Sequence, residues 1–255
     1  MLLRIAHTTS YQYEAPVPYV LQQLRLRPKS RTNQNVRSWD IRVDGGVKEL
    51  CYEDEHANTV DLISFQPGVT ETAVHCTGEV EVTDNNGIVG RHNGFVPLWL
   101  YQRSTALTRV GAQMRALLHA LSAHILGVLP YSTEQADPSL TAEQVLALGK
   151  GVCQDHAHVF IAAARHIGFP ARYVSGYLMM NEQVEQNASH AWAEVHVDTL
   201  GWIGFDVSNG QSPDARYVRV ATGLDYTGAA PVSGMRFGGG DDRENMMVTL
   251  RVEQQ

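Results

Sequence analysis

The sequence has few cysteines, no long apolar run and no cluster of basic residues. Its 255 residues include three cysteines, Cys51, Cys76 and Cys153. This number is typical of single thiols in a reducing compartment, and we expect Cys51 and Cys76 to be buried in strands. No apolar stretch approaches the ~20 residues of a membrane helix, and residues 1–7 turn polar too soon for a signal peptide. We therefore expect a cytoplasmic protein without a membrane partner.

The overall charge is negative and does not favour a nucleic-acid partner. The net charge is −7, the isoelectric point is near 5.8, and no strip of Lys and Arg forms. In the one basic stretch, Leu24 and Leu26 alternate with Arg25 and Arg27, which predicts a strand with a solvated basic face. The hydrophobic content of 44% is ordinary for a globular chain.

Residues 1–95 have the pattern of β-structure. Runs with the character of strands are separated by turn-forming residues and lie at 36–43, 50–52, 60–65 and 72–83. The last run has one apolar parity, made of Val74, Cys76, Val80 and Val82. Because no helical pattern interrupts these strands, we expect an N-terminal β-sandwich-like module over residues 1–95.

Residues 96–255 have a mixed pattern, which predicts an α+β domain. Helices are expected over 104–124, after a capping box at Thr141 and Gln144, and from Cys153 to about Gly168. The third helix should have one buried stripe, made of Ala157, Phe160, Ile161, Ala164 and Ile167. Further strands are expected over 171–178, 190–197, 202–207 and 246–252, with a loop at 238–242.

Cys153 stands where the third helix is predicted to begin, in the run Gly-Val-Cys-Gln-Asp-His of residues 151–156. A thiol becomes a nucleophile as the thiolate, and the free N–H groups of a first helical turn favour negative charge. Gly149 and Gly151 allow a sharp turn and leave space for a substrate beside the sulfur. A buried structural cysteine on a helix face is the competing interpretation.

His190 and Asp206 lie in two predicted strands that are joined by a turn at residues 198–201. If Trp192 pairs with Asp206 across this hairpin, His190 faces Ser208, and His190 and Asp206 become diagonal neighbours on one face. A carboxylate in that position can orient the imidazole and stabilise the imidazolium. A register shifted by one residue would place Asp206 on the opposite face. The pattern therefore predicts a triad of Cys153, His190 and Asp206.

Four motifs resemble the bacterial transglutaminase-like superfamily, and they lie at residues 151–158, 168–177, 190–194 and 202–206. Residues 5–13 and 25–28 resemble the N-terminal β region that accompanies this core in bacteria. The resemblance implies a papain-like or transglutaminase-like core with helices packed on an antiparallel sheet, and it assigns the catalytic triad to Cys153, His190 and Asp206. Bacterial members commonly have an aromatic residue at position 156, where this chain has His156, which we expect to point away from the sulfur.

The resemblance implies acyl transfer on an amide bond of a peptide or a glutamine side chain. Water as the acceptor would make the protein a cysteine protease or amidase, whereas an amine would make it a transglutaminase-like acyltransferase, and the triad is the same for both. The oxyanion would be held by the backbone N–H of Cys153 and a second donor, for which Tyr131 and Gln154 are candidates. Trp192 either lines the cleft or packs in the core.

A catalytically silent domain that acts as a protein-binding scaffold is the alternative function. We expect a protein or peptide substrate, no cofactor and no metal. His156 and His158 are two residues apart and so do not share a helix face. His190, Glu194 and His196 are spread along ~20 Å of strand. The oligomeric state is not indicated by the sequence.

Overall fold

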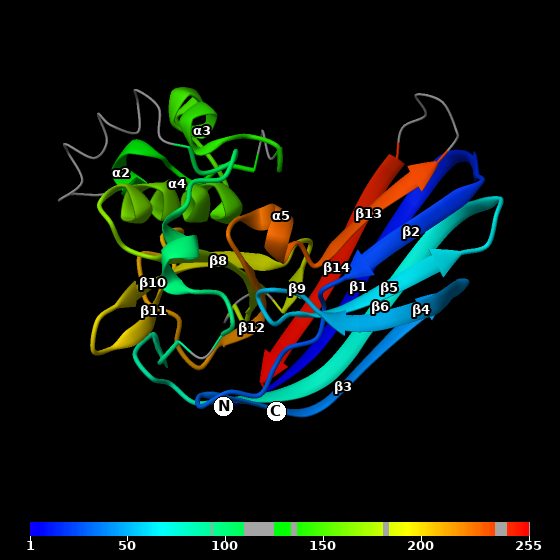
Figure 1. Ribbon diagram of the computed structural model, residues 1–255. Helices are drawn as coiled ribbons and strands as arrows, with labels where there is room; N and C mark the ends of the chain where they lie inside the picture. The colour runs from blue at the N-terminus through cyan, green and yellow to red at the C-terminus, as the bar shows by residue number, and fades with distance from the viewer. Residues whose placement is uncertain (93, 110–124, 134–136, 181–183, 238–243, 255) are drawn as a thin grey trace.

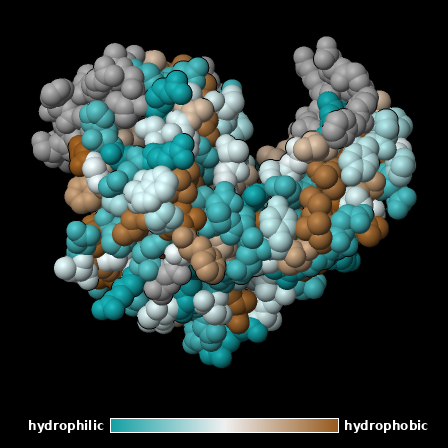
Figure 2. Space-filling view, viewed as in Figure 1, coloured by the Kyte–Doolittle hydropathy of each residue, from teal (hydrophilic) through white to brown (hydrophobic). Residues whose placement is uncertain are grey.

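The structure is a computed structural model of residues 1–255 that describes all of them except 93, 110–124, 134–136, 181–183, 238–243 and 255. The described part is mostly antiparallel sheet with few helices. In Figure 1 the helices gather on one side, long strands extend on the other, and the two termini lie side by side. Figure 2 shows that the surface is hollowed between these two sides.

Two of the three sheets are built mainly from the first 82 residues. Their strands are β1 (Leu2–Val17), β2 (Tyr19–Leu24), β3 (Gln34–Asp44), β4 (Gly46–Glu53), β5 (Thr59–Phe65), β6 (Val69–Val82), β9 (Glu185–Gln186), β13 (Val232–Phe237) and β14 (Glu244–Gln254). One sheet has the order β3-β6-β1-β14-β9 and the other β13-β2-β5-β4. Side chains of both sheets share one core, which includes Leu24, Ile63, Phe65, Val74 and Cys76.

The buried parity predicted for residues 72–83 is confirmed, since Val74, Cys76, Val80 and Val82 are at most 2% exposed. The prediction that Cys51 is buried is wrong. Cys51 is exposed because it lies on β4, which is the edge strand of its sheet and is mostly exposed.

The predicted solvated face of the basic stretch is also wrong, although Leu24 and Leu26 are buried as expected. Arg25 Nε lies 3.0 Å from Asp54 Oδ2, and Arg27 Nε lies 2.8 Å from Asp61 Oδ2. Both carboxylates are almost fully buried. These guanidinium groups therefore compensate buried carboxylates rather than form a free basic surface.

The third sheet carries the candidate site. Its strands are β7 (Ile88–Gly90), β8 (Ala171–Leu178), β10 (His190–Val197), β11 (Gly201–Phe205) and β12 (Tyr217–Gly223), in the order β12-β8-β10-β11-β7. The helical elements are η1 (Leu98–Gln102), α2 (Ile125–Val128), α3 (Ala142–Leu148), α4 (Cys153–His166) and α5 (Tyr226–Ala229). The helix α4 packs on this sheet, with Ala157 and Ile161 in one cluster with Ala191 and Ala193 of β10.

The helix α4 is buried on two sides, whereas one stripe was predicted. Ala157, Ile161 and Ala164 face the sheet as expected, but Ile167 lies beyond the end of the helix and is 60% exposed. The opposite side, which includes Val159, packs against α2 and α3. The helix α4 therefore lies between the third sheet and the helices α2 and α3. Close packing on both sides holds the helix, and with it Cys153 at its first residue, in place.

The capping box of α3 is confirmed. The Thr141 hydroxyl accepts from the Gln144 backbone N–H at 3.3 Å, and the Gln144 side-chain oxygen Oε1 accepts from the Thr141 N–H at 2.9 Å. The helix ends at Gly149 with φ 69°. Of the helix predicted over 104–124, residues 104–109 contain a bend and a turn but no helix. Residues 110–124 and the loop predicted at 238–242 lie outside the described residues.

The C-terminal strands return to the sheets formed by the first residues. Strand β14 pairs with β1 from Leu3 opposite Gln254 to Tyr13 opposite Glu244, and β13 pairs with β2. Conversely, β7 from the N-terminal part pairs with β11 of the third sheet. The boundary at residue 95 stays a prediction. Among the described residues, no helix has the length and apolar character needed to cross a membrane.

Candidate active site

The first turn of α4 places Cys153 against the cluster that α4 forms with strands β8 and β10. The N-cap residue Val152 is extended, and the Asp155 carboxylate accepts from the Val152 N–H at 2.9 Å. A Cβ on Gly151 would lie 2.8 Å from the Cβ of Asp155 and 2.9 Å from its Oδ2, so this close approach requires glycine. Cys153 is half-buried, and the unpaired N–H groups of a helix N-terminus surround such a position.

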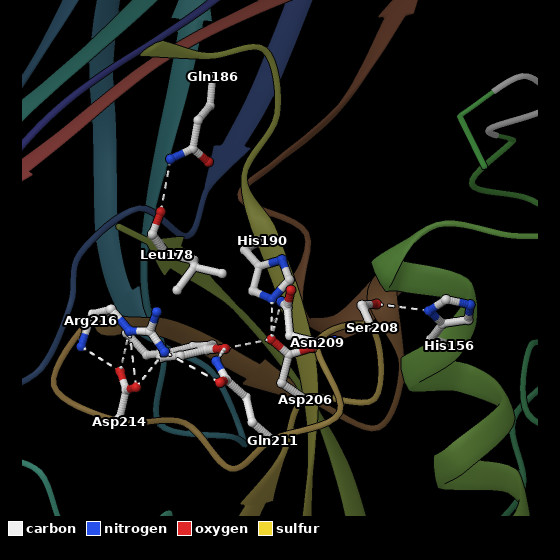
Figure 3. Close-up of polar contacts among 11 residues, drawn as sticks. His156, Leu178, Gln186, His190, Asp206, Ser208, Asn209, Gln211, Asp214 and Arg216 are labelled. Carbon is white, nitrogen blue, oxygen red and sulfur yellow. Dashed lines mark hydrogen bonds and ion pairs between the residues drawn. The ribbon is translucent and has the colours of Figure 1, made fainter. Parts of the chain in front are cut away.

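His190 and Asp206 meet as the predicted hairpin register requires. Ala193 pairs with Phe205 and Glu194 with Gly204, which is the predicted register, and Asp206 follows directly after the last paired residue. His190 Nε2 lies 2.7 Å from Asp206 Oδ2, and Figure 3 shows the two side chains pointing toward each other. Because the ionised carboxylate can only accept, Nε2 carries the proton and donates it.

Asp206 is held by more donors than the sequence suggested. It is 1% exposed, and its Oδ2 also accepts from the Asn209 side-chain amide and from the Tyr217 hydroxyl, each at 2.7 Å. Burial alone would raise the pKa of Asp206, but the hydrogen bond and charge of His190, together with these donors, hold that pKa below its ordinary value. Asp206 is therefore a fixed anion beside the imidazole.

The imidazole of His190 lies between Asp206 and Cys153. Burial lowers its pKa, but hydrogen bonds with Asp206 and with the Cys153 sulfur and the charges of both groups outweigh burial and raise the pKa to about 10. Since Nε2 is occupied by Asp206, Nδ1 is the nitrogen left for the sulfur. The ring is therefore protonated at neutral pH when it faces both acidic partners.

Trp192 packs behind His190 and does not open onto the surface. It is 3% exposed, its ring centroid lies 6.2 Å from that of His190, and it meets Tyr217 edge-on at 5.5 Å. A Cβ on Gly176 of the neighbouring strand would lie 2.5 Å from the Trp192 ring and 2.2 Å from the Val218 carbonyl oxygen. Of the two interpretations of Trp192, the geometry favours packing.

His156 joins the segment after α2 to the turn after β11, and Figure 3 shows it pointing from α4 toward Ser208. Its Nε2 donates to the Leu129 carbonyl oxygen at 2.9 Å, and its Nδ1 accepts from the Ser208 hydroxyl at 2.8 Å. The side chain is fully buried, and burial lowers its pKa. His156 is therefore a neutral imidazole with one tautomer, used for positioning.

Replacing His156 with phenylalanine should lower the free energy of unfolding by about 1–3 kcal/mol, because the Leu129 carbonyl and the Ser208 hydroxyl each lose a buried partner. Urea unfolding measures this loss. The matched control is His166→Phe, which makes the same change at the exposed last residue of α4. A loss no larger in His156→Phe than in His166→Phe would refute the positioning role.

The two predicted oxyanion donors lie in different surroundings. Tyr131 is 55% exposed, and its backbone forms an isolated β-bridge with Gly151. Partial burial and the charge of Cys153 raise the pKa of its hydroxyl. Tyr131 thus lies beside the sulfur. The Gln154 side-chain amide instead donates to the Pro138 carbonyl oxygen at 3.2 Å. An oxyanion role for either residue stays a prediction.

The other titratable side chains of the motifs bind separate partners, and among the described residues they do not form a metal site. His158 Nε2 accepts from the Tyr226 N–H at 3.1 Å, on a different side of α4 from His156. Glu194 is paired with Arg172 and Arg219 on the face of the sheet opposite α4. Within the described ranges, no three His, Cys, Asp or Glu residues are grouped to hold a metal ion.

Two family models match the chain. Residues 3–81 match the bacterial transglutaminase-like N-terminal region, and residues 102–207, which contain Cys153, His190 and Asp206, match the transglutaminase-like superfamily. The chain therefore has a transglutaminase-like core and a bacterial transglutaminase-like N-terminal region. The predicted resemblance is thereby confirmed for both regions.

Relatives of this transglutaminase-like chain include uncharacterized proteins of mycobacteria. One from Mycobacterium leprae is 28% identical over 280 residues, which cover 97% of this chain and 98% of the relative. One from Mycobacterium tuberculosis is 32% identical over 147 residues, which cover 54% of this chain and 46% of the relative. A crystal structure of a candidate cysteine protease from Cytophaga hutchinsonii has a TM-score of 0.75 at 18% identity and covers 100% of this chain and 91% of that one. This likeness shows a shared fold.

Sequence reasoning missed the residues that hold Asp206 and His156 in the transglutaminase-like core. The stretch of residues 206–211 contains Asn209-Gly210, a turn signal that would have predicted a side chain folding back on Asp206. Ser208 was expected to face His190, but its hydroxyl binds His156. No sequence signal indicates Tyr217, which reaches Asp206 from β12.

Proposed function

We propose that the protein transfers acyl groups from amide bonds through Cys153, His190 and Asp206. The observation that carries this proposal is the His190 imidazole, which hydrogen-bonds Asp206 at 2.7 Å and has a pKa raised to about 10 beside the Cys153 sulfur. An imidazolium next to a thiol at a helix N-terminus favours the thiolate, which is the nucleophilic form.

In the proposed first step the Cys153 thiolate attacks the amide carbonyl carbon and forms a carbon–sulfur bond. The negative charge moves to the carbonyl oxygen, where the N–H of Cys153 in the first turn of α4 can donate to it. The His190 imidazolium then gives its Nδ1 proton to the leaving nitrogen, and the carbon–nitrogen bond breaks to leave a thioester.

In the second step neutral His190 takes a proton from the acceptor, which attacks the thioester and releases Cys153. Water as the acceptor yields a carboxylic acid, and a primary amine yields a new amide. Asp206 keeps the imidazole in one tautomer throughout and stabilises its charged form. We propose a protein or peptide as the acyl donor, and a cytoplasmic location remains a prediction from the cysteine content.

The test is a defined glutamine-containing peptide, with ammonia release and peptide fragments measured in the same reaction. Ammonia without fragments indicates a glutamine amidase if the glutamine becomes glutamate, and transamidation if the peptide gains the mass of an added primary amine minus ammonia. Fragments indicate a protease. If a panel of such peptides yields none of these products above the level of buffer alone, the proposed function is wrong and the scaffold alternative is favoured.

A further inference from the structure

A small polar cavity lies on the face of the third sheet opposite α4. Its volume is about 30 Å³, and its lining includes Arg31, Trp192, Glu194, Tyr217 and Arg219. This space holds one or two atoms the size of a water oxygen. Since Trp192 contacts His190 and Tyr217 donates to Asp206, these two side chains stand between the cavity and the candidate active site.

Arg219 lines this cavity and carries hydrogen-bond donors that have no partner in the described part of the chain. It is 8% exposed, and its Nη2 donates to Glu194 Oε2, but its Nε and Nη1 have no partner among the residues that the structure describes. Neighbouring groups are already committed, since the Gln34 amide binds the backbone N–H and C=O of Arg219. Buried guanidinium donors without an acceptor are costly.

Positive charge exceeds negative charge around the cavity. The single carboxylate of Glu194 is shared by Arg219 and by Arg172, whose Nε lies 2.7 Å from Oε2. Arg31 adds a third guanidinium at the exposed edge of the lining. Burial lowers the pKa of Arg219, and Glu194 opposes that shift. The cluster therefore lacks a negative charge.

We propose that this cavity binds a monovalent anion of the size of chloride, held by Nε and Nη1 of Arg219 and attracted by Arg31. The other acidic group of the lining, Asp214, does not supply the missing charge because it is paired with Arg216 at 2.6 Å. Water is the competing occupant, since it could accept from Arg219 and donate to Glu194 Oε1, which is also unpaired in the described part of the chain. Water would leave the excess positive charge in place.

Crystals of the full chain grown without halide and soaked in sodium bromide provide the direct test. We expect an anomalous bromide peak in the cavity, within contact distance of the Arg219 guanidinium. Density for water with no anomalous signal would overturn the proposal. Neither result depends on catalysis by Cys153, so the proposal can fail while the proposed function stands.

Thermal unfolding in sodium chloride and in sodium gluconate of equal ionic strength separates a bound ion from general screening. We expect a saturable rise in Tm with chloride only, reduced about threefold or more in Arg31→Gln by weaker binding. The control Arg37→Gln removes a surface guanidinium paired with Glu81 and should keep the full rise. A rise that gluconate reproduces, or that Arg31→Gln keeps, overturns the proposal. A bromide peak without any chloride-specific rise means an adventitious ion only and also overturns it.

Discussion

Cys153→Ala should reduce ammonia release or peptide cleavage by about 10⁴–10⁶-fold, which is the usual cost of removing a covalent nucleophile. The change deletes one half-buried sulfur at the first residue of α4 and leaves His190 and Asp206 in place. The fold should persist, because alanine favours a helix more than cysteine does. Initial rates on the same peptide, at equal concentrations of folded protein, measure the effect.

The matched control is Cys51→Ala, which removes an exposed thiol on the edge strand β4. It should have the wild-type rate. If Cys153→Ala and Cys51→Ala both keep the wild-type rate, the measured activity does not pass through a Cys153 thioester, and the proposed mechanism is wrong.

Asp206→Asn should lower kcat/KM by about 10²–10⁴-fold. The substitution keeps the size of the side chain but removes the charge that, with the hydrogen bond, holds the His190 pKa near 10 against burial. The asparagine oxygen can still accept from His190 Nε2, as well as from Asn209 and Tyr217, so the loss comes from the missing charge. This loss of charge reduces the imidazolium that protonates the leaving group.

The pH dependence of kcat/KM should also change in a defined direction in Asp206→Asn. A raised pKa means that the imidazolium persists as pH increases and is lost only as pH passes about 10. In Asp206→Asn the alkaline limb of kcat/KM should therefore move to lower pH. The control Asp198→Asn makes the same change at the exposed turn of the same hairpin and should leave rate and profile unchanged. A wild-type rate and profile in Asp206→Asn would show that Asp206 does not act on His190.

The hairpin was predictable because strand parity and a tight turn constrain it together. The alternation of residues 190–197 and the turn after Val197 predict the register in which Ala193 pairs with Phe205. A shift of one residue would have turned Asp206 to the other face. The helix that begins at Cys153 was predictable for a similar local reason, since Asp155 can reach back to its N-cap and Gly151 allows the close approach.

The remaining features depend on contacts between distant parts of the chain. Tyr217 and Ser208 reach their partners from β12 and from the loop after β11, and no periodicity within one element indicates such contacts. The burial of α4 on two sides requires α2 and α3. The return of β14 to β1 joins residues about as far apart as the chain permits, which local patterns do not specify.

The most direct test of the account is the rate at which iodoacetamide alkylates each cysteine between about pH 6 and 7, where an ordinary thiol is mostly protonated. The chain contains its own references: a hydrogen bond to Asp61 raises the pKa of Cys51, and burial raises that of Cys76 to about 12. Peptide mapping by mass spectrometry reports all three sites in one reaction.

We predict that Cys153 reacts about tenfold or more faster than a short unstructured peptide with one cysteine, and that His190→Gln removes most of this advantage. Cys51 and Cys76 should react more slowly than the peptide and should not change in the variant. If Cys153 in the wild-type protein reacts no faster than the peptide, it is not an activated nucleophile, and the central claim is contradicted.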